Sequence, residues 1–201
     1  MAIDSILLPV DRWPPPWSLK QVFGNDRPVE IEIGFGKGGF LVESSQAYPA
    51  CNFLGVESAG KMAHYTAQRL AKRGIENVRI LFADAHYVLA RLVPEAGFSA
   101  VHVYFPDPWP KKRHRKRRLL TGEFLEKLEK ALQPGGRLHF ATDFQDYFEE
   151  TRSLFSRFPA FKPLDPRSWV ESRPERCITN YEVKYRREGR PIYYALYERA
   201  S

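Results

Sequence analysis

The sequence has few cysteines, no long apolar run, no internal repeat and no low-complexity segment. Cys51 and Cys177 are too few for a disulfide framework and form no metal-ligand spacing, so we expect two reduced thiols and no metal site. No apolar stretch is long enough to cross a bilayer, and the N-terminus lacks the apolar core of a signal peptide. These absences exclude membrane-spanning and secreted classes and predict a soluble protein of the cytoplasm.

Basic residues exceed acidic residues by seven, and this excess lies in one short run. Residues 111–118 contain seven Lys or Arg side chains, and the exception is His114. Without these seven, 24 basic residues remain against 24 acidic residues. Such a run is often a solvated face or a disordered tail. Its position in mid-chain, directly after the apolar segment 100–105, favours a binding surface instead.

The basic run follows a short corner that contains an acid and an aromatic ring, Asp107 and Trp109. Pro106 and Pro108 stiffen this corner, so we expect it to expose both side chains. An acid and a ring beside a cationic strip indicate a place where a nucleic-acid base is held while its phosphates are bound. The alternative for Trp109 is a structural role as the anchor of the corner.

Apolar segments of strand length alternate with segments of helical periodicity. The expected strands are 29–33, 53–57, 78–82, 100–105 and 137–142, and the expected helices are 40–48, 61–73, 86–92, 121–132 and 144–155. This alternation predicts an α/β fold with a mostly parallel sheet and right-handed crossovers. The aromatic runs 181–187 and 192–198 are expected to form a C-terminal antiparallel hairpin. By analogy, this outline is that of the Rossmann-like methyltransferases.

The expected organisation is an N-terminal arm, residues 1–27, followed by one domain, residues 28–201. A chain of 201 residues is long enough to bury one substantial core. The arm contains Trp13-Pro-Pro-Pro-Trp17, which favours an extended segment packed on a surface over a helix.

A glycine-rich loop follows the first expected strand. Gly34, Gly36 and Gly39 satisfy the dinucleotide-binding pattern, and Glu57 lies at about the distance expected of a ribose-binding acid. This pattern fits NAD nearly as well as S-adenosylmethionine, and a third alternative is a loop that only makes a turn. Glu32, just before the loop, would repel a pyrophosphate but suits a cofactor that carries positive charge.

Acidic side chains occur at the ends of successive expected strands, where ligands of parallel sheets bind. Glu32 is expected to face the methionine end of the cofactor, Glu57 the ribose hydroxyl groups and Asp84 the adenine amino group. The alternative is that each is a solvated acid at a strand end. Three such acids in succession favour the cofactor interpretation.

Five segments together resemble the bacterial tRNA (guanine-N7)-methyltransferases. They are Glu32-Ile-Gly-Phe-Gly-Lys-Gly38, Gly55-Val-Glu57, Phe105-Pro-Asp-Pro-Trp-Pro-Lys-Lys-Arg-His-Arg-Lys-Arg-Arg118, Ala141-Thr-Asp143 and Thr179-Asn-Tyr-Glu182. The likeness runs from about residue 28 to the C-terminus, and the Pro-Asp-Pro-Trp block with its basic tail is its most specific part. The resemblance implies S-adenosylmethionine as cofactor, tRNA as partner and N7 of the variable-loop guanosine 46 as methyl acceptor.

The resemblance also implies roles for individual residues. The implied cofactor-binding residues are Glu32, Gly34, Gly36, Gly38, Glu57, Asp84, Ala85 and Asp107, and Asp107 is also the implied catalytic residue. The implied substrate-binding residues are Trp109, Lys111, Lys112, Arg113, Arg115, Arg117, Arg118, Asp143, Thr179, Asn180, Tyr181 and Glu182. As alternatives, Asp143 could cap the helix that begins near residue 144, and Thr179 and Glu182 could be strand-pairing residues. A monomer or a homodimer is expected.

Three rival functions fit parts of the sequence. An NAD-dependent oxidoreductase is disfavoured by Glu32 beside the glycine loop. A non-catalytic RNA-binding protein would need only the basic run. A methyltransferase that acts on DNA or on an exocyclic amine would use Asp107-Pro-Trp109 as the motif whose acid accepts a hydrogen bond from the amino group being methylated. The basic tail fits the tRNA family better.

Overall fold

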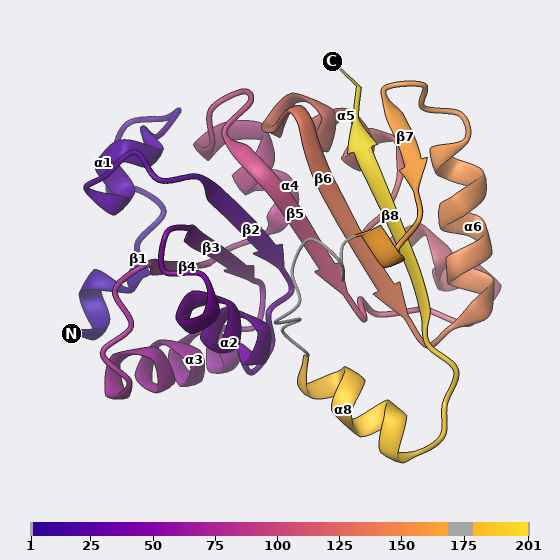
Figure 1. Ribbon diagram of the computed structural model, residues 1–201, viewed down its shortest axis with the longest axis horizontal. Coiled ribbons are helices and arrows are strands. Elements are labelled where there is room, and N and C mark those ends of the chain that lie inside the picture. The colour runs from indigo at the N-terminus through magenta and orange to yellow at the C-terminus, as the bar shows by residue number, and fades with distance from the viewer. Residues whose placement is uncertain (1, 169–178, 201) are drawn as a thin grey trace.

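The computed structural model of this protein describes residues 2–168 and 179–200. Eight strands form one sheet in the order β1-β4-β3-β2-β5-β6-β8-β7 (Figure 1). The strands are β1 (Leu7–Leu8), β2 (Val29–Ile33), β3 (Asn52–Glu57), β4 (Val78–Phe82), β5 (Phe98–Tyr104), β6 (Leu132–Thr142), β7 (Phe161–Leu164) and β8 (Tyr193–Arg199). Strands β1 to β6 pair in parallel, and β8 runs antiparallel to both β6 and β7.

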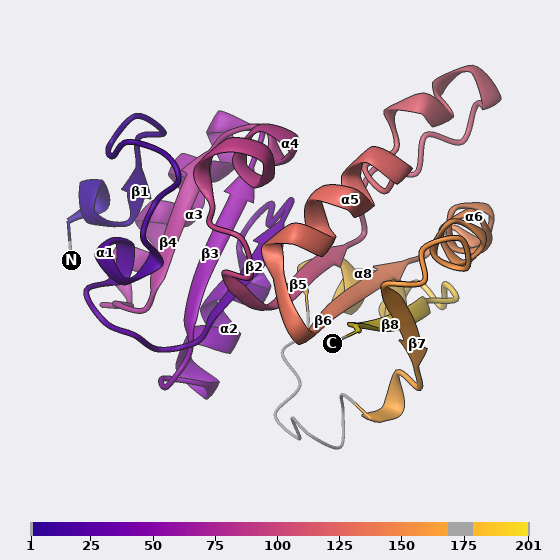
Figure 2. The same cartoon turned by 90° about the horizontal axis from the view of Figure 1, so that it is seen from above.

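Helices cover both faces of the sheet (Figures 1 and 2). The helices are α1 (Leu19–Phe23), α2 (Gly39–Ala47), α3 (Gly60–Lys72), α4 (Ala85–Tyr87), α5 (Gly122–Ala131), α6 (Gln145–Phe155) and α8 (Asn180–Arg187), the 3-10 helices η1 (Ile3–Ser5) and η3 (Lys112–Arg117), and the π-helix η2 (Val88–Leu92). One hydrophobic core lies between the sheet and α2 and α3. A second core lies between the opposite face and η2, α5 and α6.

The five parallel strands expected from the alternating pattern are confirmed. Helix α5 starts as expected, because the Thr121 side chain accepts a hydrogen bond from the Phe124 backbone N–H. The expected helix at 86–92 is divided into α4 and the π-helix η2. None of the described helices combines the length and the apolar character that a membrane crossing requires.

The antiparallel strands at the C-terminal end are confirmed, but the expected first strand of the hairpin is wrong. Residues 181–187 belong to helix α8, and β8 pairs with β6 and β7 instead. The Thr179 side chain accepts a hydrogen bond from the Glu182 backbone N–H at 3.1 Å and so caps this helix. A Thr followed three residues later by Glu is the capping-box pattern, and this local signal outweighs the β-propensity of the tyrosines.

The N-terminal arm contributes to the same sheet as the rest of the chain. Strand β1 pairs with β4, and Trp17 is buried in a core with 2% of its surface exposed. Its indole N–H donates to the Trp13 carbonyl at 2.9 Å. Residues 19–23 form the short helix α1, where an extended segment was expected. The division of the chain at residue 27 stays a prediction.

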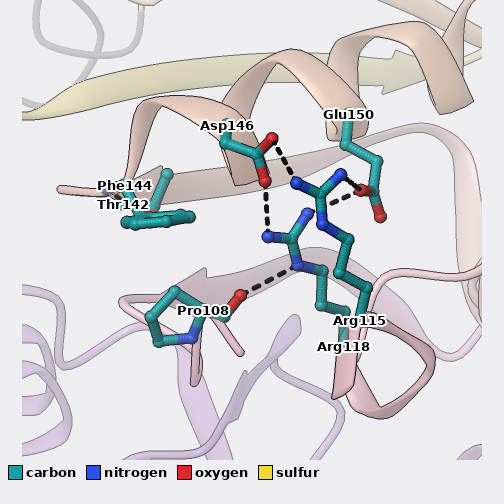
Figure 3. A network of polar contacts seen from close by, with 7 residues as sticks. All are labelled: Pro108, Arg115, Arg118, Thr142, Phe144, Asp146 and Glu150. Atoms are coloured by element: carbon teal, nitrogen blue, oxygen red, sulfur yellow. Dashed lines mark hydrogen bonds and ion pairs between the residues drawn. The ribbon is translucent and has the colours of Figure 1, made fainter. Parts of the chain in front are cut away.

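Arg118, the last residue of the basic run, is buried beneath α6 (Figure 3). Its guanidinium donates to Glu150 at 2.6 Å, to Asp146 at 2.7 Å and to the Pro108 carbonyl at 2.9 Å. Arg115 donates to the other Asp146 oxygen at 2.9 Å. Only 1% of the Arg118 side chain is exposed, so its charge is used to hold the loop and not presented to a ligand. Sequence reasoning placed Arg118 among the substrate contacts because burial is invisible in a run of like charges.

The hydrogen bond from Arg118 holds the pKa of the Asp146 carboxyl below its usual range, and Arg115 adds to this effect. A carboxyl with a lowered folded-state pKa stabilises the fold above its ordinary pKa. That stabilisation is lost as the pH falls through the folded-state value. The network therefore ties the loop after β5 to α6 most firmly at neutral pH.

We expect Arg118→Met to lower the free energy of unfolding at pH 7 by about 1–3 kcal/mol, because two half-exposed carboxylates and the Pro108 carbonyl lose their partner. Urea denaturation measures this difference, which should shrink in acid as the pH falls through the lowered pKa of Asp146 and its carboxylate is protonated. The control is Arg113→Met in the same run, since Arg113 is exposed and has no ion pair with a described residue. Equal losses in the two variants would contradict a structural role for Arg118.

Candidate functional site

A cavity of about 690 Å³ lies beyond the C-terminal ends of β2, β3, β4 and β5. The expected cofactor residues that line it are Glu32, Gly34, Gly36, Glu57, Asp84, Ala85 and Asp107, and the expected substrate residues that line it are Trp109, Arg117, Thr179, Asn180 and Tyr181. The structure thus brings the four acids of four successive strand ends around one space. Parallel strands make this possible because their carboxyl ends meet at one edge of the sheet.

Glu32 is the most deeply placed acid of the cavity, with 4% of its surface exposed. Its Oε2 atom is buried and has no hydrogen-bond partner. Burial, with the Glu57 charge as a second cause, raises the pKa of Glu32 to about 8. A buried carboxyl oxygen without a donor is costly unless a ligand supplies the donor. Glu32 is therefore suited to a ligand cation or amino group.

Glu57 organises the glycine-rich loop as well as lining the cavity. One carboxyl oxygen accepts a hydrogen bond from the Gly36 backbone N–H, and the other accepts one from the Ala59 N–H, both at 2.9 Å. These bonds tie the loop after β2 to the segment after β3. Each oxygen keeps a second lone pair that a hydroxyl group of a ligand can use.

Two glycines are required by the shape of this loop. Gly36 has a φ of 50°, and its carbonyl accepts a hydrogen bond from the Thr66 hydroxyl at 3.0 Å. Gly38 has a φ of 65°, and a Cβ atom there would lie 2.3 Å from Thr66 Cγ2. Gly38 does not line the cavity. It allows α2 to begin close against α3.

Asp84 ends the loop after β4, where its side chain caps α4 by accepting from the Tyr87 N–H at 3.1 Å. The side chain is exposed at the rim of the cavity, next to Ala85. A capping carboxylate has further lone pairs, so this contact leaves room for a ligand donor.

Asp107 lies on a strained loop after β5. Phe105 has a φ of 50° and Trp109 a φ of 42°, values in the left-handed region that larger side chains rarely adopt. The Phe105 N–H donates to the Ala141 carbonyl at 2.8 Å, and Arg118 holds Pro108 from the other side (Figure 3). The two anchors hold a conformation that turns the exposed Asp107 carboxylate toward the cavity.

Trp109 is held by side chains of the basic run. The Arg117 guanidinium carbon lies 4.9 Å from the Trp109 ring centroid, and the His114 ring lies edge-on at 5.9 Å. Trp109 and Arg117 both line the cavity. The ring is therefore positioned at the cavity wall, with positive charge against it.

The other predicted substrate residues lie outside the cavity. Lys111, Lys112 and Arg113 are exposed on η3 and the residue before it. Asp143 does not cap α6, because its carboxylate accepts a hydrogen bond from Arg190 at 3.0 Å and Phe144 occupies the cap position. Arg115 takes part in the network with Asp146.

Helix α8 closes one side of the cavity with Thr179, Asn180, Tyr181 and Lys184. Glu182 points away from the cavity and is buried with 3% of its surface exposed. Its carboxylate accepts hydrogen bonds from the Tyr194 hydroxyl at 2.6 Å and from Arg186 at 2.8 Å. Glu182 thus fixes α8 against β8 and does not reach a ligand in this arrangement.

Several cavity residues were missed by sequence reasoning, among them Tyr104, Phe105 and Lys184. The Tyr104 hydroxyl is hydrogen-bonded to His102 Nδ1 at 3.0 Å, and His102 Nε2 to Glu30 at 2.9 Å. The signal in the sequence was the period of two, which places His102 and Tyr104 on one face of β5. Lys184 was missed because its segment was expected to be a strand.

The donor set of the cavity fits a cofactor that combines positive charge with a nucleoside. Glu32 offers an unpartnered buried oxygen, and Glu57 and Asp84 offer further acceptors for hydroxyl and amino groups. Phe35, Met62 and the aromatic residues around them supply apolar surface. Within 2–168 and 179–200, no three His, Cys, Asp or Glu side chains are grouped so that they could hold a metal ion.

Solved structures of similar shape are S-adenosylmethionine-dependent methyltransferases. The 16S rRNA methyltransferase KamB superposes with a TM-score of 0.62 at 15% identity, over 90% of this chain and 92% of that one. An O-methyltransferase from Thermotoga maritima superposes with a TM-score of 0.56 at 17% identity, over 91% of this chain and 63% of that one. These likenesses show the Rossmann-like methyltransferase fold.

Comparison of sequences identifies the family. A family model described as "Putative methyltransferase" matches residues 26–195. A tRNA (guanine-N(7)-)-methyltransferase from Rhodopirellula baltica is 39% identical over 99% of this chain and 76% of its own length. Enzymes of the same name from Nitrosococcus oceani and Vibrio cholerae are 36% and 38% identical, over 92% and 96% of this chain and 77% and 81% of their own lengths. By these matches and by the cavity that gathers its acids, the chain belongs to the tRNA (guanine-N7)-methyltransferase family.

Proposed function

We propose that this chain transfers the methyl group of S-adenosylmethionine to N7 of guanosine 46 in the variable loop of tRNA. The observation that carries the proposal is the position of Asp107. Its carboxylate lies at the cavity that Glu32, Glu57 and Asp84 also line, and Trp109 and Arg117 of the basic run line the same cavity. The relatives that match almost the whole chain are named tRNA (guanine-N(7)-)-methyltransferases, which supports the methyl acceptor N7 of a tRNA guanine.

S-adenosylmethionine supplies an electrophilic methyl group on a positively charged sulfur. In the proposal, Glu32 binds the amino group of the methionine part, because its buried oxygen needs a donor. Glu57 accepts from the ribose hydroxyl groups, and Asp84 with Ala85 holds the adenine. Gly34 and Gly36 allow the loop to pass close to the cofactor, and Gly38 sets the direction of α2.

Guanine N7 carries an in-plane lone pair and no proton, so no base is needed to expose the nucleophile. Alignment and electrostatics must supply most of the acceleration. In the proposal, Asp107 accepts a hydrogen bond from the guanine and stabilises the positive charge that develops on the ring. The strained backbone at Phe105 and Trp109 fixes this carboxylate before the substrate arrives.

Trp109 is proposed to stack on the target base, which would contribute roughly 1–3 kcal/mol. Lys111, Lys112, Arg113 and Arg117 are proposed to contact phosphates, which raises affinity without selecting sequence. Arg115 and Arg118 serve instead to hold the loop through α6.

The rim of the cavity next to α8 completes the proposed tRNA surface. Thr179, Asn180 and Tyr181 line the cavity there. Asp143, whose carboxylate accepts a hydrogen bond from Arg190, is also proposed to contribute to substrate binding. The reaction is proposed to take place in the cytoplasm. The expected monomer or homodimer stays a prediction.

The methyl acceptor can be tested with three tRNA transcripts that differ at position 46. We expect labelled methyl groups to pass from S-adenosylmethionine to the transcript with guanosine 46. We expect no transfer to the transcript with adenosine 46 or to that with 7-deazaguanosine 46, which lacks the nucleophilic nitrogen. Scintillation counting followed by cleavage at the modified base locates the product. Label in the adenosine transcript would contradict the proposal.

Asp107→Asn should lower kcat by at least about 100-fold, because the isosteric amide loses the charge that stabilises the transition state. Circular dichroism should show an unchanged fold, since Asp107 is exposed. The matched control is Asp84→Asn, which should raise KM for the cofactor and change kcat much less. Nearly full activity of Asp107→Asn with an unaltered pH profile would refute the assigned role.

Glu32→Gln tests the cofactor cation site through pH. Because the pKa of Glu32 is about 8 in the free protein, its ionised form is scarce near pH 6. We expect the affinity for S-adenosylmethionine, measured by titration calorimetry, to rise about tenfold per pH unit from pH 5.5 to 7.5. Glu32→Gln should bind weakly with little dependence on pH, whereas Asp84→Asn should keep the trend. A flat profile for the wild type would exclude the assignment.

The raised pKa of Glu32 also makes the free energy of unfolding depend on pH. A carboxyl whose folded-state pKa exceeds its ordinary value of 4.5 stabilises the fold fully below that value. This contribution is lost as the pH rises toward 8. Glu32→Gln should therefore become more stable relative to the wild type between pH 5 and 8.

A further inference from the structure

Helix α3 carries a set of cations that the overall charge balance of the chain conceals. From Ser58 to Ile75 the sequence contains Lys61, Arg69, Lys72 and Arg73 and no acidic residue. The acids that balance these charges in the total lie elsewhere. A local surface of one sign attracts a partner of the opposite sign, even where the rest of the protein is neutral.

The spacing of these residues places them on one side of the helix. Ala63, Thr66, Ala67 and Leu70 form the buried face. Lys61, Tyr65, Arg69 and Arg73 follow one another at intervals of four residues, which aligns them along the helix, and Lys72 adjoins them. We call these five residues the α3 stripe. Tyr65 has 49% of its surface exposed, so an aromatic face lies among the cations.

The cations of the α3 stripe are not neutralised by the described part of the protein. Arg69 donates to the Lys37 carbonyl at 2.8 Å, and Arg73 donates to the Arg69 carbonyl at 3.2 Å. Both acceptors are backbone groups without charge. Across residues 2–168 and 179–200, no carboxylate lies within ion-pairing distance of Lys61, Arg69, Lys72 or Arg73. In α5, by contrast, Lys127 pairs with Glu123 at 2.6 Å.

The α3 stripe begins at the cavity. Ala59 and Met62, at the start of α3, line the cavity, as does Lys37. From there the helix extends for about 20 Å, since each of its residues adds about 1.5 Å. Helix α3 packs on the face of the sheet that α2 shares, whereas η3 contacts α6 on the other face (Figures 1 and 2). Cations therefore flank the cavity on two sides.

We propose that the α3 stripe binds the phosphate backbone of the tRNA substrate, so that the RNA lies across the cavity and contacts the protein on both flanks. The inference rests on the proposed function. Four-residue steps along α3 are about 6 Å each, so successive side chains can reach separate phosphates. Tyr65 offers a ring on which a base or ribose can pack, the combination found in sequence-tolerant nucleic-acid surfaces. Helix α3 contributes affinity, and the basic run orients the loop at Asp107.

The test compares two variants that each remove three positive charges. The first is Lys61→Gln/Lys72→Gln/Arg73→Gln, which keeps Arg69 because that side chain supports the cofactor loop. The control is Arg91→Gln/Lys130→Gln/Lys162→Gln. These three cations have no ion pair with a described residue, and Lys130 lies at the opposite edge of the sheet, where its carbonyl accepts from Ala96. Because the two variants have the same net charge, any difference in their affinity for tRNA reports local contacts and not long-range electrostatic attraction.

Affinity for tRNA is measured by fluorescence anisotropy from 50 to 300 mM KCl. We expect the α3 variant to lose about tenfold in affinity at 100 mM salt, and its plot of log K against log salt to become shallower by about 2 to 3, as three phosphate contacts are lost. The control should change affinity less than twofold and keep the slope. Affinity for S-adenosylmethionine and kcat at saturating tRNA should be unchanged in the α3 variant, while KM for tRNA rises.

Two outcomes separate this inference from the proposed function. If the wild type methylates tRNA and the α3 variant matches the control, the second RNA surface is refuted and the proposed reaction stands. If the wild type neither binds nor methylates tRNA, both fail. A third variant, Lys111→Gln/Lys112→Gln/Arg113→Gln, should lower the slope independently. Combined with the α3 variant, it should give the sum of the two changes, because the two surfaces lie on opposite flanks.

Discussion

The parallel order of β4, β3, β2 and β5 is the constraint on which the site depends. It brings four strand ends to one edge, and each end carries an acid that lines the same cavity: Glu32, Glu57, Asp84 and Asp107. Because Glu32 is buried and the Glu57 charge acts on it, the pKa of Glu32 is raised to about 8. A buried carboxyl group without a hydrogen-bond donor is complementary to a ligand that carries positive charge.

The position of Asp107 also depends on a second, less evident interaction. Left-handed backbone at Phe105 and Trp109 costs on the order of 1–3 kcal/mol at each residue and persists only if the surroundings enforce it. Arg118 supplies this enforcement by joining the Pro108 carbonyl to two acids of α6 (Figure 3). One cationic segment therefore has two physical roles. Its buried arginine holds the loop that carries Asp107, and its exposed lysines are available to phosphates.

The positions of the charged residues say more about this protein than its net charge does. Outside residues 111–118 acids and bases are equal in number, yet the surface of α3 carries cations without acids. Four acids line the cavity, and helices α5 and α6 carry three acids each. The cavity lined by four acids therefore has cations on two flanks. Such a distribution suits a cationic cofactor inside the cavity and a polyanionic substrate across its opening.

The sequence alone determined the alternating strands, the glycine loop and the acids at the strand ends, because these are repeated local patterns that the backbone translates directly into position. It also contained the capping box at Thr179 and Glu182 that makes 180–187 a helix. Only the tertiary structure decided which charges are buried. The environment of Arg118 is set by Asp146 and Glu150, and that of Glu32 by Glu57. Asp146 and Glu150 lie 28 and 32 residues from Arg118 along the chain, and Glu57 lies 25 residues from Glu32, so no local pattern reports these environments.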